Sequence, residues 1–265
     1  MTKLIHRVDA FAEGKYKGNP AGVYYVNEDL SDIELQNIAK RAGLPVTAFV
    51  KHIDNNKFHI RWFTMNTEVN LCGHATMAAS YSIAKEFSIK EIQYHSISGP
   101  LKVSILDDEK IAMDFPTQVT APCDELTHNK IEETLGIKVK NCHFGFDDYL
   151  VELESGQAVV EFQPDFEKIL QLDCRGIIIT SWDDQYGFDC ISRFFCPKVA
   201  IDEDQVCVSA HCKIVPYWQA QKEKQYLHAW QASENGGELH LYSLENNRVQ
   251  IQGKARFVNM IVLDN

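Results

Sequence analysis

Two short segments of the chain each pair a cysteine with an upstream glutamate and a downstream alanine. Residues 68–75 read EVNLCGHA, and residues 203–211 read EDQVCVSAH. In each segment the glutamate lies four residues before the cysteine and the alanine three residues after it. The two cysteines, Cys72 and Cys207, are separated by about half of the 265-residue chain. This repetition predicts two halves of related structure.

Each cysteine comes at the predicted start of an apolar helix, over residues 72–87 and about 207–219. The first N–H groups of a helix have no partner within it, and the macrodipole adds roughly half a positive charge there. Two such starts facing one cleft would bind a carboxylate, and the same field would lower the pKa of a thiol. A thiolate on one side and a thiol on the other could move a proton from one face of a carbon to the other, without metal or organic cofactor.

The polar residues near these helix starts also have structural interpretations. Asp204 is expected either to orient a proton-transfer group or to cap the second helix. His74 could bind ligand or relay protons, or could bond a neighbouring carbonyl. Glu68 is favoured near a helix N-terminus and is also the nearest spare base. Asn19 is expected to stabilise a turn, with a ligand contact as the alternative.

The elements around the two helices explain how they would be positioned. A helix that is apolar nearly all round must be buried, and strand-rich sequence can shelter it only if the sheet wraps around it. We therefore predict an α+β fold of two pseudo-symmetric domains, residues 1–117 and 118–265, each a β-barrel or roll around a central apolar helix. Two placements of the last strand fit this scheme: it belongs to the second domain or it crosses back to the first. Strands are expected at residues 4–11, 21–26, 47–53, 58–63, 91–98, 101–106, 110–115, 149–154, 158–162, 177–181, 189–195, 238–243, 247–252 and 256–263, and further helices at 32–42, 129–135 and 166–172.

The composition of the chain indicates in which cellular compartment the protein is expected and which kinds of partner are excluded. Asp and Glu number 37 against 26 Lys and Arg, so the net charge of −11 repels nucleic acid. No run of 18 apolar residues and no signal peptide is found, and we expect a soluble, cytoplasmic protein that does not bind membranes. The eight cysteines include no CxxC pair, and the Cys and His spacings match no zinc signature. We therefore expect reduced thiols and no metal or cofactor.

Longer motifs run along nearly the whole chain. They are VDAF at 8–11, GNPAGV at 18–23, FTxxxEVxLCGHAT at 63–76, EDxVxxSAHC at 203–212, PYW at 216–218 and GKA at 253–255. Together they resemble the phenazine-biosynthesis PhzF-like family. That resemblance implies the architecture of diaminopimelate epimerase, with two similar domains and an active site between them.

The same resemblance implies a cofactor-independent isomerase that moves a proton on a small carboxylate-bearing substrate. The family's catalytic Glu corresponds to Val46, which carries no proton. His74 and Asp204 match the family's histidine and aspartate, whereas the family's Thr-Gly-Ser is here Cys207-Val208-Ser209. Loss of the Glu together with gain of Cys207 is what a change of base would look like.

The predicted site thus has two walls. We expect Cys72, His74, Asp204 and Cys207 to be catalytic, and the substrate to be bound by Asn19, Val46, Gly73, Val208, Ser209 and Ala210. The first hypothesis is an isomerase, in its sharper form a two-thiol racemase or epimerase. The alternative is an inactive descendant that binds a metabolite or a protein. A homodimer is compatible with either.

Overall fold

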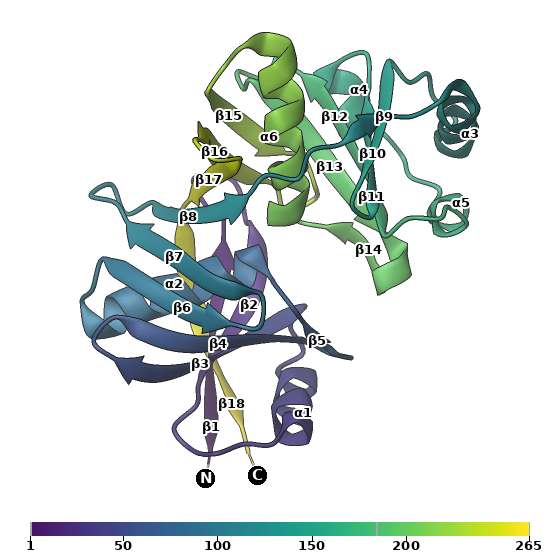
Figure 1. The fold of residues 1–265 in the computed structure, drawn as a ribbon. Coiled ribbons are helices and arrows are strands. Elements are labelled where there is room, and N and C mark those ends of the chain that lie inside the picture. Colours follow the sequence, from purple (N-terminus) through teal and green to yellow (C-terminus); the bar gives the residue numbers. More distant parts are fainter. Residues whose placement is uncertain (1, 184, 265) are drawn as a thin grey trace. The chain divides into compact units, whose positions relative to one another are not determined.

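The computed structural model describes residues 2–183 and 185–264, and in them the chain forms a mixed α/β fold with six α-helices. The chain divides into two compact units (Figure 1). Unit 1 comprises the described residues up to Asp114 together with those from Gln252 onward, and unit 2 comprises Phe115–Ile251. The return of the last segment to unit 1 agrees with a last strand that crosses back. The expectation of two domains divided after residue 117 remains a prediction.

Unit 1 is built from strands that pair along the chain and around one central helix. Its elements are β1 (Lys3–Ala10), β2 (Asn19–Tyr25), α1 (Asp32–Ala42), β3 (Val46–Asp54), β4 (Lys57–Thr64), β5 (Glu68–Val69), α2 (Gly73–Phe87), β6 (Glu91–Ser96), β7 (Gly99–Ile105), β8 (Ile111–Pro116), which runs into unit 2, and β18 (Ala255–Leu263). Strand β18 pairs with β1 in antiparallel orientation. Helix α2 packs against β1, β2, β3 and β18, and most of its side chains from His74 to Ile83 are buried.

Unit 2 follows the same plan with different helices on its outer side. Its elements are β9 (Ala121–Pro122), α3 (Glu125–Leu135), β10 (Asn141–Gly145), β11 (Asp148–Glu152), α4 (Gly156–Glu161), α5 (Phe166–Leu170), β12 (Gly176–Trp182), β13 (Cys190–Cys196), a 3₁₀ turn (Pro197–Val199), β14 (Ile201–Asp204), α6 (Val208–Lys222), β15 (Tyr226–Gln231), β16 (Gly237–Leu244) and β17 (Arg248–Gly253). Helix α6 packs against β12 and β16. It is the counterpart of α2.

The order of strand pairings is the same in both units. In unit 1, β1–β2 is antiparallel, β2–β3 parallel, β3–β4 antiparallel, β4–β5 antiparallel, β4–β6 parallel and β6–β7 antiparallel. In unit 2 the pairs β10–β11, β11–β12, β12–β13, β13–β14, β13–β15 and β15–β16 have these orientations in the same order. The repeat that was predicted from two short segments therefore extends through six successive strand pairings.

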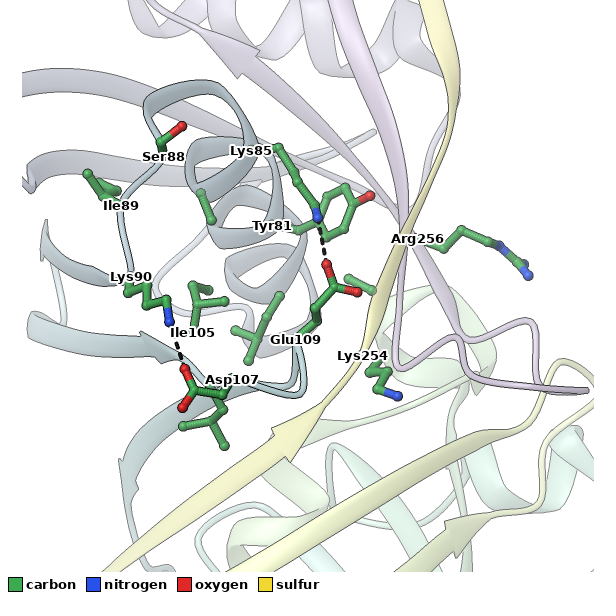
Figure 2. Close-up of a pocket in the computed structure, with 14 residues that line it drawn as sticks. Tyr81, Lys85, Ser88, Ile89, Lys90, Ile105, Asp107, Glu109, Lys254 and Arg256 are labelled. Atoms are coloured by element: carbon green, nitrogen blue, oxygen red, sulfur yellow. Dashed lines mark hydrogen bonds and ion pairs between the residues drawn. The ribbon is translucent and has the colours of Figure 1, made fainter.

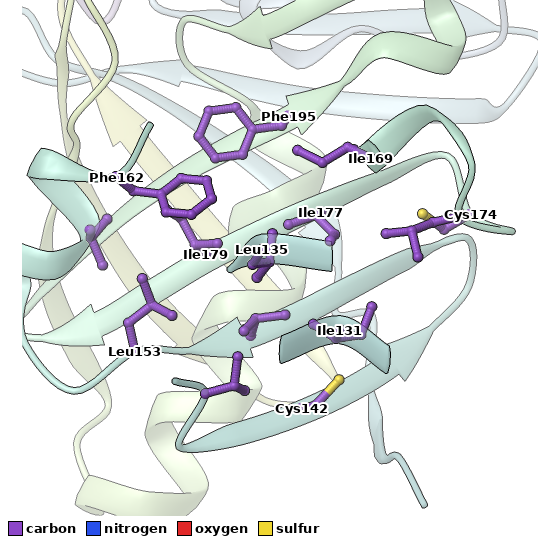
Figure 3. Packing of buried hydrophobic residues seen from close by; sticks show 14 of the residues in the cluster. Ile131, Leu135, Cys142, Leu153, Phe162, Ile169, Cys174, Ile177, Ile179 and Phe195 are labelled. Carbon is purple, nitrogen blue, oxygen red and sulfur yellow. The ribbon is translucent and has the colours of Figure 1, made fainter. Parts of the chain in front are cut away.

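Unit 2 has an apolar core on the side of its sheet that α3 and α5 cover. Figure 3 shows Ile131 and Leu135 of α3 facing Ile177 and Ile179 of β12, with Phe195 of β13 beside them. All of these side chains are nearly inaccessible to solvent. Burial of each contributes about 1.5–3 kcal/mol, which fixes the strands that carry the candidate site residues.

Three sequence predictions need correction. Residues 158–162 are not a strand: Ser155 accepts a hydrogen bond from the Ala158 N–H at 3.1 Å and begins helix α4. Strands β10 and β15 were not predicted. No strand was expected directly before either apolar helix, but the short strands β5 and β14 lie there. Within the described residues, none of the helices is both long and apolar enough to cross a membrane.

Candidate active site

Unit 1 places Cys72 at the N-cap of α2, followed at once by Gly73 and His74. The Cys72 Sγ lies 3.4 Å from Nδ1 and 3.9 Å from Nε2 of the largely buried His74 ring. The Cys72 carbonyl accepts two hydrogen bonds from Thr76, from its N–H at 3.0 Å and from its Oγ1 at 2.7 Å. These bonds hold the first turn of α2 and leave the Cys72 thiol partly exposed, beside an imidazole with which it can exchange a proton.

Unit 2 places Cys207 at the N-cap of α6 in an equivalent arrangement. Its carbonyl accepts hydrogen bonds from the N–H of His211 at 3.3 Å and from Nδ1 of the same residue at 2.7 Å. Its N–H donates to Oε1 of Gln231 at 2.8 Å, and Gln231 donates in turn to the Asp204 carbonyl. The side chains at the fourth helical position, Thr76 in α2 and His211 in α6, thus bind back to the N-cap carbonyl in both units.

The two thiols have different surroundings. Cys207 is buried, and its Sγ lies 3.3 Å from the Ser209 hydroxyl. Burial, and next the charge of Asp204, raises the pKa of the Cys207 thiol above its ordinary value, although Arg175 opposes the shift. The lowering of a thiol pKa that a helix N-terminus favours is not found at Cys207, because the cost of burying a thiolate exceeds the effect of the helix. As a neutral thiol, Cys207 is suited to donate a proton.

A buried ionic cluster that sequence reasoning missed supports the second helix start. Arg175 binds Asp148 with both Nε and Nη2, and Lys213 donates to the same carboxylate at 2.8 Å. Arg175 Nη2 also donates to Ser209 Oγ at 3.1 Å, which links the cluster to the residue beside Cys207. Asp148 and Lys213 are essentially inaccessible to solvent. The signal was present in the sequence, because a lysine in an otherwise apolar helix must have a buried partner.

Glu68 is held in an ion pair. Arg61 on β4 donates from Nε to Oε1 and from Nη2 to Oε2 of Glu68, both at 2.7 Å. Glu68 lies opposite Phe63 in the β4–β5 pairing, and the Arg61 guanidinium lies over the Phe63 ring, 5.0 Å from its centroid. With both oxygens engaged by arginine, Glu68 positions the segment before α2 and is a poor spare base.

Unit 2 repeats this ion pair. Arg193 on β13 binds Glu203 through bonds of 2.7 and 2.9 Å, Glu203 lies opposite Phe195, and the Arg193 guanidinium lies 4.8 Å from the centroid of that ring. The glutamate of each sequence repeat is therefore the anchor of the strand that leads to the cysteine.

The structure also locates the remaining predicted substrate-binding residues. Val46 begins β3 opposite Thr64 and is 4% exposed. Asn19 begins β2 opposite Ala10 and is buried. Gly18, before it, has φ +71°, and a Cβ there would lie 2.1 Å from the Ala10 carbonyl oxygen, so this turn requires glycine. In unit 2, Val208 and Ala210 are buried in the first turn of α6. Unit 1 thus groups Cys72, Gly73 and His74, and unit 2 groups Asp204, Cys207 and Ser209.

A separate cavity of about 390 Å³ lies in unit 1, at the opposite end of α2 from Cys72 (Figure 2). Tyr81, Lys85 and Ser88 of α2 line it together with residues of β7 and β18. Its acidic groups are paired, Glu109 with Lys85 and Asp107 with Lys90. None of the predicted site residues contributes to it.

Comparisons with known proteins extend along the whole chain. Residues 8–260 match the family described as Phenazine biosynthesis-like protein (PhzC-PhzF). The chain is 40% identical over 256 residues to a Pseudomonas aeruginosa protein named Uncharacterized isomerase PA3578, covering 96% of this chain and 95% of that protein. It is 35% identical, with a TM-score of 0.90 and full coverage of both chains, to the crystal structure of a PhzF-family phenazine biosynthesis protein from Enterococcus faecalis. A hydroxyproline epimerase from Agrobacterium vitis shares the fold alone, at 7% identity and a TM-score of 0.62 over 99% of this chain and 92% of that one.

Proposed function

Because this chain belongs to the phenazine biosynthesis-like family and is an isomerase like its curated relatives, we propose that it moves a proton on a small carboxylate-bearing metabolite without a cofactor. The observation that carries the proposal is the matched pair of helix starts. Each presents a cysteine at the N-cap, a hydrogen bond from the fourth helical residue to the N-cap carbonyl, and an arginine-bound glutamate on the preceding strand.

The proposed ligand follows from the electrostatics of these helix starts. The first N–H groups of α2 and α6 point along the helix axis without intrahelical partners, and such groups bind carboxylates. Gly73 keeps side-chain atoms away from the first turn of α2. Arg175 supports a positive potential near Ser209, since its guanidinium donates to that hydroxyl. An amino acid or hydroxy acid matches this chemistry.

We assign different roles to the two thiols. Cys72, partly exposed and beside His74, would act as the base, and its Sγ would take the proton as the Cα–H bond breaks. The bonding electrons would pass into the carboxylate as an enediolate, which helix N–H groups would stabilise. Cys207, whose pKa is raised by burial, would return a proton from its Sγ–H to the opposite face of the carbon. His74 and Asp204 would restore the protonation of the two thiols.

The proposal includes an arrangement of the halves. We propose that each unit is a barrel-like domain around its helix and that the two helix starts face one cleft between them, lined also by Asn19, Val46, Val208, Ser209 and Ala210. We also propose that the protein is cytoplasmic, that it forms a homodimer and that its partner is a small-molecule substrate. A ligand-bound crystal structure in its closed form with sulfurs more than ~10 Å apart would contradict the shared thiol mechanism, because proton transfer needs hydrogen-bond reach.

A second candidate is a descendant that binds a metabolite without turning it over. Two points favour it: the resemblance assigns Val46 to the position of the family's catalytic Glu, and burial raises the pKa of the Cys207 thiol. A metabolite that raises the melting temperature without any proton exchange would support this candidate.

Solvent deuterium exchange at the α-carbon tests the proposal. The full chain is incubated in D₂O with a panel of amino acids and hydroxy acids, and exchange is followed by NMR. We expect exchange that is lost in Cys72→Ser and in Cys207→Ser. Matched controls are Cys123→Ser, which is partly exposed like Cys72, and Cys212→Ser, which is buried in α6 like Cys207. Exchange that survives both site substitutions but not His74→Gln or Asp204→Asn would instead indicate the family's usual groups.

A further inference from the structure

The hairpin of β15 and β16 in unit 2 brings two imidazoles and one carboxylate to the same face of the sheet. His228 on β15 is the direct cross-strand partner of His240 on β16. Glu238 lies two residues before His240, so its side chain is on the same face. One ligand atom from each of the three residues lies within 4.8 Å of the other two.

The three donor atoms are close enough to share an ion and open enough to receive one. Glu238 Oε1 lies 2.7 Å from His228 Nε2 and 3.7 Å from His240 Nε2. Around a tetrahedral ion with bonds of about 2.0–2.1 Å, neighbouring ligand atoms are separated by roughly 3.3 Å, which falls between these two distances. The side chains of His228, Glu238 and His240 are 30%, 22% and 16% exposed. An ion can therefore reach them without unfolding the hairpin.

The two imidazole rings lie next to each other, and the Tyr226 hydroxyl orients one of them. The His228 and His240 rings are stacked 4.9 Å apart at an interplanar angle of 6°. Because the Nε2 lone pair lies in the plane of its ring, at least one ring must turn out of the stack about χ2, a soft torsion, before both nitrogens can bind the same ion. The Tyr226 hydroxyl lies 2.7 Å from Nδ1 of His240 and binds that nitrogen, which leaves Nε2 directed toward Glu238. Metal-binding histidines commonly have such a partner on the second ring nitrogen.

From this geometry we propose that His228, Glu238 and His240 bind one first-row divalent transition ion, of which Zn²⁺ is the representative. Two imidazoles and a carboxylate are a donor set that Zn²⁺ accepts with a water as fourth ligand. Mg²⁺ and Ca²⁺ prefer oxygen ligands throughout and are excluded by the same donor set. The ion would replace the hydrogen bond between His228 and Glu238 and clamp the two strands together.

The expectation of no metal was based on the spacing of Cys and His residues along the sequence. That spacing does not reveal a site whose ligands lie on two paired strands. Glu238 follows His228 by ten positions, across the turn that joins β15 to β16, and only the strand register brings the two residues together. The site lies wholly within unit 2. It is independent of the thiol mechanism.

Calorimetric titration of the full chain with ZnCl₂, under reducing conditions, tests the proposal. We expect one saturable binding event and none with MgCl₂. His240→Gln and Glu238→Gln should each weaken the affinity by more than about tenfold, since even outer partners of metal ligands contribute that much, and Tyr226→Phe should cause a smaller loss. The matched control is His59→Gln/His95→Gln. That pair also lies on adjacent strands, with ring centroids 5.7 Å apart, but no third ligand group accompanies it among the described residues.

The absorption spectrum of bound Co²⁺ distinguishes binding at this site from binding at the cysteines. The Co²⁺ complex of the chain should show d–d absorption without a thiolate-to-cobalt charge-transfer band, and circular dichroism should confirm that each variant is folded. Absence of saturable Zn²⁺ binding would overturn the proposal. So would undiminished binding in folded His240→Gln, or a cobalt spectrum dominated by thiolate charge transfer.

Discussion

Arg193 holds Glu203 in two parallel hydrogen bonds, four residues before Cys207, and Arg61 holds Glu68 in the same way four residues before Cys72. The two pairs differ in exposure. The side chains are 10% and 14% exposed in the Arg193–Glu203 pair, but 37% and 30% exposed in the Arg61–Glu68 pair. The same Arg–Glu hydrogen-bond geometry thus occurs once in a buried and once in a partly exposed environment. The two pairs can therefore be compared within one protein.

Glu203→Gln should destabilise the protein far more than Glu68→Gln. The first substitution leaves the Arg193 guanidinium buried and uncompensated, which costs about 3–5 kcal/mol. The second leaves Arg61 partly in water and still paired with Asp32, so we expect about 1 kcal/mol or less. Urea unfolding measures both. Equal losses would show that burial does not distinguish the pairs.

The ionic cluster behind Ser209 should respond asymmetrically to substitution. Asp148→Asn leaves Arg175 and Lys213 with only the half-exposed Asp147 carboxylate as a counter-charge, and we expect a loss of several kcal/mol. Lys213→Met keeps the Arg175–Asp148 pair and fits an apolar helix, so we expect a loss below about 2 kcal/mol. Urea midpoints test this order. A larger loss in Lys213→Met would mean that the lysine is the essential partner of Asp148.

His211 should make stability fall as the solution is acidified. Burial lowers the pKa of His211 to about 4, against an ordinary value of 6.5 in the unfolded chain. Between these values the unfolded state binds a proton that the folded state does not. The contribution of neutral His211 is thus complete above about pH 6.5 and is lost progressively toward pH 4, by up to about 1.4 kcal/mol per pH unit.

A His211→Gln variant provides the comparison for this pH dependence. Glutamine keeps a donor that can reach the Cys207 carbonyl but does not titrate. The free energy of unfolding should therefore vary less between pH 7 and pH 5 in the variant than in the wild type. Parallel curves for the two proteins would exclude His211 as the group responsible.

Val46→Glu tests whether the site uses thiols or the family's usual carboxylate. Val46 is nearly inaccessible, so a carboxylate placed there is poorly solvated, and it would repel both a substrate anion and a nearby thiolate. We expect the substitution to depress deuterium exchange and to raise the pH at which iodoacetamide modifies Cys72. Val46→Gln controls for size. An increase in exchange on a PhzF-type substrate would show that the scaffold retains the family's machinery, and no change in activity, ligand binding or thiol reactivity would place Val46 outside the site.

Local signals in the sequence were sufficient for most helices and strands, including the starts of the two apolar helices. The helix expected at 32–42 is α1, and it begins with a capping box of Ser31 and Glu34, two partners that lie within one turn. The apolar stretches at 72–87 and 207–219 correspond to α2 and α6, and the repeated Glu-to-Cys spacing marks both helix starts. These features depend on residues at most a few positions apart. The prediction of a strand at 158–162 failed for a related reason, because a short stretch of mostly apolar residues fits either a strand or a short helix.

Tertiary structure alone decided how the functional groups are paired. Arg175 and Lys213 meet at Asp148 although they lie on different elements, and this cluster supplies the cation next to Ser209. Burial depth, which spacing does not encode, made Cys207 a weak acid, although the sequence placed it at the same kind of helix start as Cys72. Strand register likewise brought Glu238 to His228. The sequence determines which residues begin a helix or alternate along a strand, whereas the pairing of distant strands determines which charges share a dry environment and therefore which protons can move.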